Sequence, residues 1–174
     1  MAMSIEQLQA RFDANELKYH ADPTSARLLL RFGGDAGTYD AVVQLESDGR
    51  LLQYRSLQLL SCPADHPHLQ QTLSLLGRIN YETRFPKLGW DPSDGEIVAY
   101  ADVILEDGEL TDAQTRTLTL TFLMALDQAY GKLRKSIEEG PGGESVERAS
   151  LESGRPSEAL RRLLERARAR SGGS

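Results

Sequence analysis

The clearest signal of the fold is DGEIVAYADVILEDGELT, residues 94–111. Between the turn signals Asp94-Gly95 and Asp107-Gly108, apolar residues occupy every second position, which predicts a strand over 96–106. The residues on one face of this strand are Ile97, Ala99, Ala101, Val103 and Leu105. Thr111 then begins a helix, with Gln114 placed for a capping box. The stretch therefore predicts a half-buried strand followed at once by a helix.

Helices are expected on both sides of this strand in the chain. In the helix that follows it, apolar residues recur at spacings of three or four, so they share one helix face. They are Leu118, Phe122, Leu126, Tyr130, Leu133 and Ile137. An earlier helix, ending near 80–82, has Asp65 as a possible cap and Pro67 in its first turn. A first helix follows Ser4, which forms a capping box with Gln7.

Alternating apolar residues predict further strands. The expected ranges are 17–21, 27–32, 39–46, 51–60 and 84–90. The connections between them are too short for parallel crossovers, so the sheet is expected to be antiparallel. The element order is α-β-β-β-β-α-β-β-α, with helices packed on an antiparallel sheet, which defines an α+β domain.

If the helices cover one face of this sheet, the opposite face still carries apolar side chains. The residues expected there are Leu29, Val42, Leu57, Leu59, Val98, Tyr100 and Ile104. Because monomeric proteins seldom leave a large apolar patch in water, this face is expected to bind a partner protein or a second subunit. Strand twist and long arginine side chains are the alternative cover.

Length and composition place the chain among ordinary water-soluble proteins. It has 174 residues, a mass of 19.3 kDa and a net charge of −6, which does not favour general nucleic-acid binding. Cys62 is the only cysteine in the sequence, so an intrachain disulfide is impossible. No apolar run reaches the roughly 18 residues that span a bilayer, and residues 1–15 lack a signal-peptide core. A cytoplasmic location without a membrane span is expected.

The charge divides the chain near Gly140-Pro141-Gly142-Gly143. Residues 1–140 contain 13 Lys and Arg against 21 Asp and Glu, a net charge of −8, whereas residues 141–174 contain 7 against 5, a net charge of +2. We expect a domain over 1–140, a flexible linker over 141–155, and a basic amphipathic helix with a disordered end over 156–174.

The arginines of the expected C-terminal helix leave several roles open. They are Arg161, Arg162, Arg166, Arg168 and Arg170. Such a helix can contact nucleic acid, anionic lipid, an acidic partner or its own acidic domain. A solvated helix without a partner is an equal alternative, because short isolated helices are marginal in water.

Residues that carry catalysis are sparse. Cys62, His66 and His68 have a spacing compatible with a zinc site, but Pro63 and Pro67 interrupt it and no second ligand pair is present. The glycine-rich residues 33–37 lack the Lys-Ser/Thr that completes a phosphate-binding loop. Trp90, the only tryptophan, is expected to be a core or sheet-edge anchor rather than an exposed contact. We therefore expect no metal, no cofactor and no enzymatic activity.

The order of several short motifs resembles the YbjN-like family of bacteria, which is similar in fold to type III secretion chaperones of the Tir-chaperone type. The matching pieces are LLGRIN (75–80), DGEIV (94–98), LEDG (105–108), LT (110–111) and LDQAYGKL (126–133). The resemblance implies a non-enzymatic, chaperone-like adaptor, commonly a homodimer, that holds segments of a partner protein. A regulator that acts in nucleic-acid transactions, through the basic helix or a DNA-binding partner, is the alternative.

Overall fold

The computed structural model describes residues 2–22 and 24–140, and the linker and basic helix expected over 141–174 lie outside them. Within the described residues, three α-helices accompany one antiparallel sheet, which confirms the expected α+β class. The helices are α1 (Ile5–Ala14), α2 (Leu69–Glu82) and α3 (Asp112–Glu139). The strands are β1 (His20–Ala21), β2 (Arg27–Gly33), β3 (Thr38–Glu46), β4 (Leu51–Leu57), β5 (Leu60–Ser61), β6 (Lys87–Trp90) and β7 (Glu96–Ile104).

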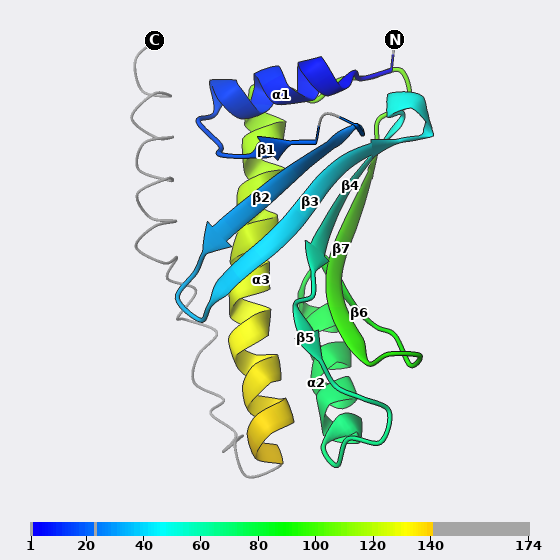
Figure 1. Ribbon diagram of the computed structural model, residues 1–174, viewed down its shortest axis with the longest axis vertical. Coiled ribbons are helices and arrows are strands. Elements are labelled where there is room, and N and C mark those ends of the chain that lie inside the picture. Colours follow the sequence, from blue (N-terminus) through cyan, green and yellow to red (C-terminus); the bar gives the residue numbers. More distant parts are fainter. Residues whose placement is uncertain (1, 23, 141–174) are drawn as a thin grey trace.

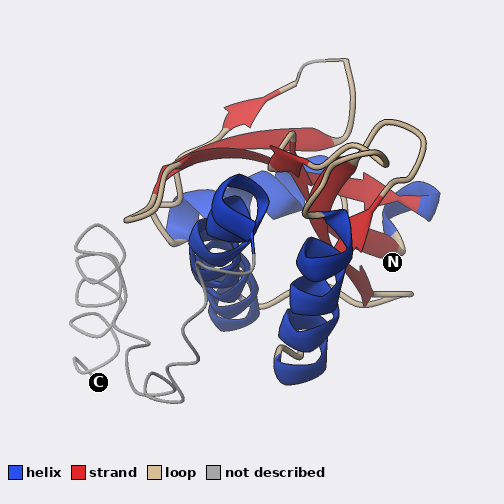
Figure 2. Cartoon of the chain, turned by 90° about the horizontal axis from the view of Figure 1, so that it is seen from below, coloured by secondary structure: helices blue, strands red, loops and turns tan. Residues whose placement is uncertain are grey.

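The strands lie in the order β1-β2-β3-β4-β7-β5, and β6 also pairs with β7. Figure 1 shows the long helix α3 running behind the sheet, with α1 across one end and α2 beside the other. Seen from below, the helices lie on one side of the sheet (Figure 2). The sheet therefore has a helix-covered face and an open face.

Alternation along the strands sorts side chains between these two faces. Leu28, Leu30 and Phe32 of β2 are buried, whereas the residues between them are exposed. The strand within the stretch 94–111, β7, buries Ile97, Ala99 and Ala101. Leu126 and Leu133 of α3 pack in the same core and are completely buried. The helix-covered face is thus a continuous apolar core.

The expected strand over 51–60 is broken at Gln58. This residue has a left-handed backbone, with φ 46°, and separates β4 from β5. In an unbroken strand, Leu57 and Leu59 would share a face, but Leu57 is 42% exposed while Leu59 is 6% exposed and packs in the core. Placing Leu59 on the open face is therefore wrong, because the break turns its side chain inward.

Local sequence determines the helix starts where a capping side chain is present. The hydroxyls of Ser4 and Thr111 each accept from the backbone N–H of the glutamine three residues later. The side-chain oxygen of each glutamine accepts in turn from the backbone N–H of the cap residue, so both capping boxes form. Helix α2 differs, since it begins at Leu69 with His68 at the cap position and no side-chain cap bond. The expectation of Asp65 as its cap is wrong.

Asn80, in the last turn of α2, positions strand β6. Its side-chain amide donates to the carbonyl of Leu88 at 2.8 Å, and its side-chain oxygen accepts from the backbone N–H of Leu88 at 2.7 Å. The Lys87 ammonium group donates to the carbonyls of Asn80 and Thr83 at the end of α2. The strand expected over 84–90 is shorter in the structure and spans Lys87–Trp90.

Asp127, in the middle of α3, holds the loop between β2 and β3. Its carboxylate accepts the backbone N–H groups of Asp35 and Ala36 at 2.9 Å and the hydroxyl of Tyr39 at 2.5 Å. The ring of Tyr130 packs edge-on against that of Tyr39, with 5.1 Å between centroids. Burial, followed by the hydrogen bond to Asp127, raises the pKa of Tyr39 above its usual range. The glycine-rich loop is therefore a hairpin anchored to a helix.

Candidate protein-binding face

The open face is built from the outward positions of β2, β3, β4 and β7. The register brings Leu29, Val42, Arg55 and Tyr100 into one row across these four strands. A second row pairs Leu51 of β4 with Ile104 of β7 near the end of the sheet. Apolar groups thus occupy both the centre and one end of the open face.

The exposure of these side chains is unusual for large apolar residues. Ile104 is 73% exposed, and Leu29, Leu57 and Tyr100 are each about 40% exposed. Val98 is half-buried, and Val42 is buried although it lies on this face. Apart from Leu59, the residues expected on the open face therefore occupy its outward positions.

Polar side chains between the apolar ones are mostly paired with one another. The Arg31 guanidinium donates two hydrogen bonds of 2.7 Å to Asp40, which lowers the pKa of that carboxyl. Arg55 lies 3.5 Å from Glu96. Gln53 donates to Asp102 at 2.9 Å. This pairing leaves an apolar surface framed by charges that partly neutralise each other.

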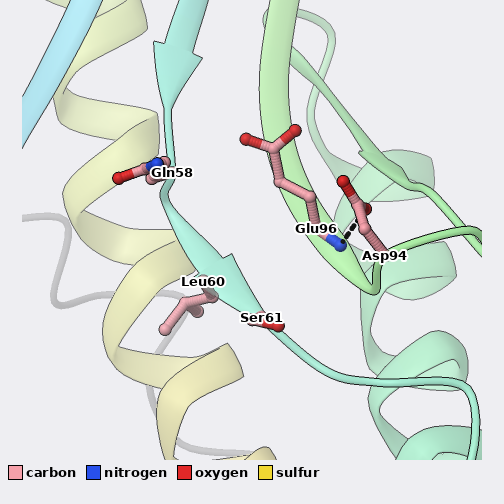
Figure 3. Close-up of a pocket in the computed structure, with 5 residues that line it drawn as sticks. All are labelled: Gln58, Leu60, Ser61, Asp94 and Glu96. Atoms are coloured by element: carbon pink, nitrogen blue, oxygen red, sulfur yellow. Dashed lines mark hydrogen bonds between the residues drawn. The ribbon is translucent and has the colours of Figure 1, made fainter.

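A shallow hollow of about 520 Å³ opens beside Gln58, where β4 is separated from β5 (Figure 3). It is lined by Gln58, Leu60, Ser61, Asp94 and Glu96. The backbone N–H of Glu96 donates to Oδ1 of Asp94 at 2.9 Å, which orders the turn before β7. The hollow lies beside two carboxylates, of which Glu96 is paired with Arg55, whereas the side chain of Leu60 packs against the core.

The residues considered for metal binding do not assemble a site. Cys62 is fully buried, and burial raises the pKa of its thiol. The ring Nδ1–H of His68 donates to the carbonyl of Ile137 at 2.8 Å, which attaches α2 to the end of α3. Over residues 2–22 and 24–140, no group of three His, Cys, Asp or Glu side chains is arranged to hold a metal ion.

Trp90 is half-buried at the edge of the sheet. Its indole N–H donates to the carbonyl of Cys62 at 2.9 Å, and the residue packs against the core. This contact places Trp90 as a sheet-edge anchor that ties β6 to the segment before α2.

No helix among the described residues is both long and apolar enough to cross a membrane. The arginines from Arg161 to Arg170 lie outside the residues that the structure describes. Their role is therefore considered below from sequence and charge.

These observations define an α+β protein whose helices cover one face of an antiparallel sheet and leave the other, partly apolar face open. The chain belongs to the YbjN family, whose model is described as "Putative bacterial sensory transduction regulator" and matches residues 4–135. No curated protein matches the chain in sequence.

Two solved structures match the chain at low sequence identity, and the first shows a similar fold. The crystal structure of YbjN from E. coli, described as a putative transcription regulator, matches with a TM-score of 0.59 and 12% identity over 77% of this chain and 93% of that one. A chain from the HopA1–SchA chaperone–effector complex matches with a TM-score of 0.49 and 13% identity, over 72% of this chain and 90% of that one.

The structure shows which contacts are made by three residues of the motifs LLGRIN (75–80) and LDQAYGKL (126–133). Asn80 pairs with the backbone of β6, and Asp127 and Tyr130 anchor the loop between β2 and β3. None of these roles is visible from sequence spacing, because the partners lie far apart in the chain. Asn80, Asp127 and Tyr130 thus stabilise the domain through contacts made by its helices.

Proposed function

We propose that this protein is a non-enzymatic, chaperone-like adaptor that binds segments of a partner protein on its open sheet face. The observation that carries this proposal is the group of large apolar side chains left exposed on that face, among them Leu57 and Tyr100 near its centre. An open face with apolar positions in alternation accepts a peptide segment through side-chain pockets. The acidic charge of residues 1–140 favours partners with basic groups.

The protein is further proposed to act as a homodimer. Leu51 and Ile104 form a cross-strand pair at one end of the face, apart from the central row that contains Tyr100. A second copy bound at this pair leaves the centre of the face and the hollow free for a partner. Burial of Ile104 stabilises the dimer by about 1.5–3 kcal/mol per side chain.

Light scattering after size-exclusion chromatography tests the dimer. The wild-type chain is expected at twice 19.3 kDa, and Ile104→Asp at the mass of one chain. Tyr81→Asp, on α2, is the matched control, because Tyr81 is 92% exposed and lies away from the sheet face. A monomeric wild type at micromolar concentration contradicts the dimer.

Affinity purification from the native host tests partner binding. A protein retained by the wild type and by Tyr81→Asp, but lost with Leu57→Asp, supports the open face as its site. Equal retention by Leu57→Asp contradicts it. Circular dichroism of each variant excludes loss of the fold as the cause.

A second candidate is a regulator in nucleic-acid transactions, acting through the basic C-terminal residues or through a DNA-binding partner. It is favoured by the description of the E. coli relative as a transcription regulator and by the arginines from Arg161 to Arg170. Titration of single- and double-stranded DNA at two salt concentrations tests direct contact, because phosphate contacts weaken steeply with salt. No binding by the full chain dismisses direct contact.

A further inference from the structure

The open face has an acidic and apolar area beside the hollow. Leu57 and Tyr100 lie exposed on neighbouring strands, whereas Leu60, at the hollow, pairs with Ile97 and packs against the core. Asp94 and Glu96 contribute carboxylates, and the single cation recorded in contact with them among the described residues is Arg55. We call this surface, formed by Leu57, Asp94, Glu96 and Tyr100, the acidic area.

The described chain ends near the same end of the sheet as the acidic area, although α3 itself lies on the helix-covered face. Gly95, in the turn between Asp94 and Glu96, lies against Cys62, since an added Cβ would be 2.7 Å from the Cys62 carbonyl oxygen. His68, six residues after Cys62, is hydrogen-bonded to the carbonyl of Ile137 at the end of α3. Gly140 lies against the His68 ring, since a Cβ added at Gly140 would be 2.5 Å from Nε2. Figure 1 shows the end of α3 beside α2 and β5.

The residues beyond Gly140 are long enough to reach this surface. Residues 141–155 span up to about 50 Å when extended. Helix α3, which has 28 residues and runs along the sheet, is about 42 Å long. A segment attached after residue 155 can therefore reach any part of the open face.

The side chains of residues 156–170 are complementary to those of the acidic area in charge and in apolar character. Residues 156–170 carry Leu160, Leu163 and Leu164 among five arginines, and two glutamates oppose them. Leucines match the exposed Leu57 and Tyr100, and guanidinium groups match carboxylates through paired hydrogen bonds. Residues 141–174 have a net charge of +2, whereas residues 1–140 have a net charge of −8.

We propose that residues 156–170 bind the acidic area of their own domain and compete there with the partner protein. This inference rests on the proposed partner-binding role of the open face. A partner then has to displace the segment, so removing the segment's charge raises apparent affinity for the partner.

A nitroxide attached to the full chain tests this contact. Ser171→Cys supplies the attachment point, and Cys62 is buried and stays unlabelled. We expect at least twofold broadening of the amide resonances of residues 57, 98 and 100, compared with Leu8 in α1. The broadening should fall in about 0.5 M salt, where charges beyond a few ångströms are screened.

Charge variants identify the surface. Asp94→Asn with Glu96→Gln should reduce the broadening, and so should reversal of Arg161, Arg162 and Arg166 to Glu. The matched control is Glu138→Gln with Glu139→Gln, which removes the same charge from α3, where these residues pair with Arg134 and Lys135. Broadening that is uniform over the surface, or unchanged by the Asp94 and Glu96 substitutions, overturns the inference.

Isotope mixing separates the chain's own segment from that of a second copy. Isotope-labelled protein without nitroxide is mixed with unlabelled protein that carries it. Broadening at residues 57, 98 and 100 in this mixture assigns the contact to a second copy and overturns the intrachain contact. Absence of broadening in every sample also overturns the inference. In that case the proposed function still stands if Leu57→Asp abolishes capture of the partner.

Discussion

Gly34 lies directly against the carboxylate of Asp127, so that a Cβ at residue 34 would collide with Oδ1. The same carboxylate accepts the backbone N–H groups of Asp35 and Ala36. A loop that approaches a helix this closely requires glycine at the point of contact. The contact ties the β2–β3 hairpin to the centre of α3, and it supports the outer strands of the open face.

Gly34→Ala is therefore expected to lower the free energy of unfolding by about 1–3 kcal/mol, because either the loop or Asp127 must move. Urea unfolding measures the loss. Gly33→Ala is the matched control, since nothing lies within 4 Å of an added Cβ there. In the Asp127→Ala background, Gly34→Ala should cost less, because the colliding group is gone. Equal costs in both backgrounds would refute the assigned collision.

Asn80→Ala should lower the free energy of unfolding by about 1–3 kcal/mol, because the backbone groups of Leu88 lose both of their side-chain partners. Asn80→Asp retains an acceptor for the Leu88 N–H but not a donor for its carbonyl, so an intermediate loss is expected. Hydrogen exchange of the Leu88 amide reports the local effect. If exchange at Leu88 stays at the wild-type rate, the pairing does not hold β6.

Stability should decrease at alkaline pH because of Tyr54. Burial raises its pKa from 10.0 to about 12, although the hydrogen bond with Thr119 opposes the shift. The folded state thus holds this proton more tightly than the unfolded state, so its contribution is complete below pH 10 and is lost between pH 10 and about 12. The loss is on the order of 2–3 kcal/mol.

Urea unfolding between pH 8 and pH 12 measures this decrease. Tyr54→Phe should reduce the slope of the profile without removing it, because the pKa of Tyr39 is also raised, and should cost about 1 kcal/mol at neutral pH for the lost hydrogen bond. Tyr81→Phe, at an exposed position, is the control and should retain the wild-type profile. A slope in Tyr54→Phe equal to that of the wild type would contradict the contribution of Tyr54 and assign the whole decrease to other groups, such as Tyr39.

Leu57 and Leu59 provide a direct comparison of the two faces. Leu59→Asp places a charge in the core and should cost at least 3 kcal/mol, whereas Leu57→Asp should change stability by less than about 1 kcal/mol. Thermal unfolding of both variants measures the difference. Similar melting temperatures would contradict the reversal of side-chain direction at Gln58.

Cys62 should resist thiol reagents in the native protein, because it is buried and its pKa is raised. Ellman's reagent at pH 8 is expected to react at least tenfold more slowly than in urea-unfolded protein. Ser61→Cys, at the exposed neighbouring position, should give one rapidly reacting thiol in addition. Rapid labelling of the wild-type protein would place Cys62 outside the core.

Much of the fold could be predicted from local patterns. Alternation over Glu96–Ile104 places Ile97 and Ala99 in the core because successive side chains of a strand point to opposite faces. The capping boxes at Ser4 and Thr111 form because their partners lie within one helical turn. The expected strand over 17–21, by contrast, is reduced to His20–Ala21, since Leu17 donates its N–H to Phe12 and closes the end of α1.

The open face was also predicted in outline, but its details depend on tertiary structure. Leu29, Tyr100 and Ile104 are outward by strand alternation alone. The hollow brings Gln58 and Leu60 beside Asp94 and Glu96, from segments that only the sheet order makes neighbours. Spacing along the chain contains no information about that pairing.

The α+β class, the faces of the regular strands and the division of charge near Gly140 could all be predicted from local sequence, because each depends on residues a few positions apart. Tertiary structure alone decided that Leu59 turns into the core, that Asp127 anchors the loop at Gly34, and that Asn80 pairs with Leu88. These outcomes depend on hydrogen bonds and close contacts between distant segments, which exist only once α2 and α3 have packed on the sheet.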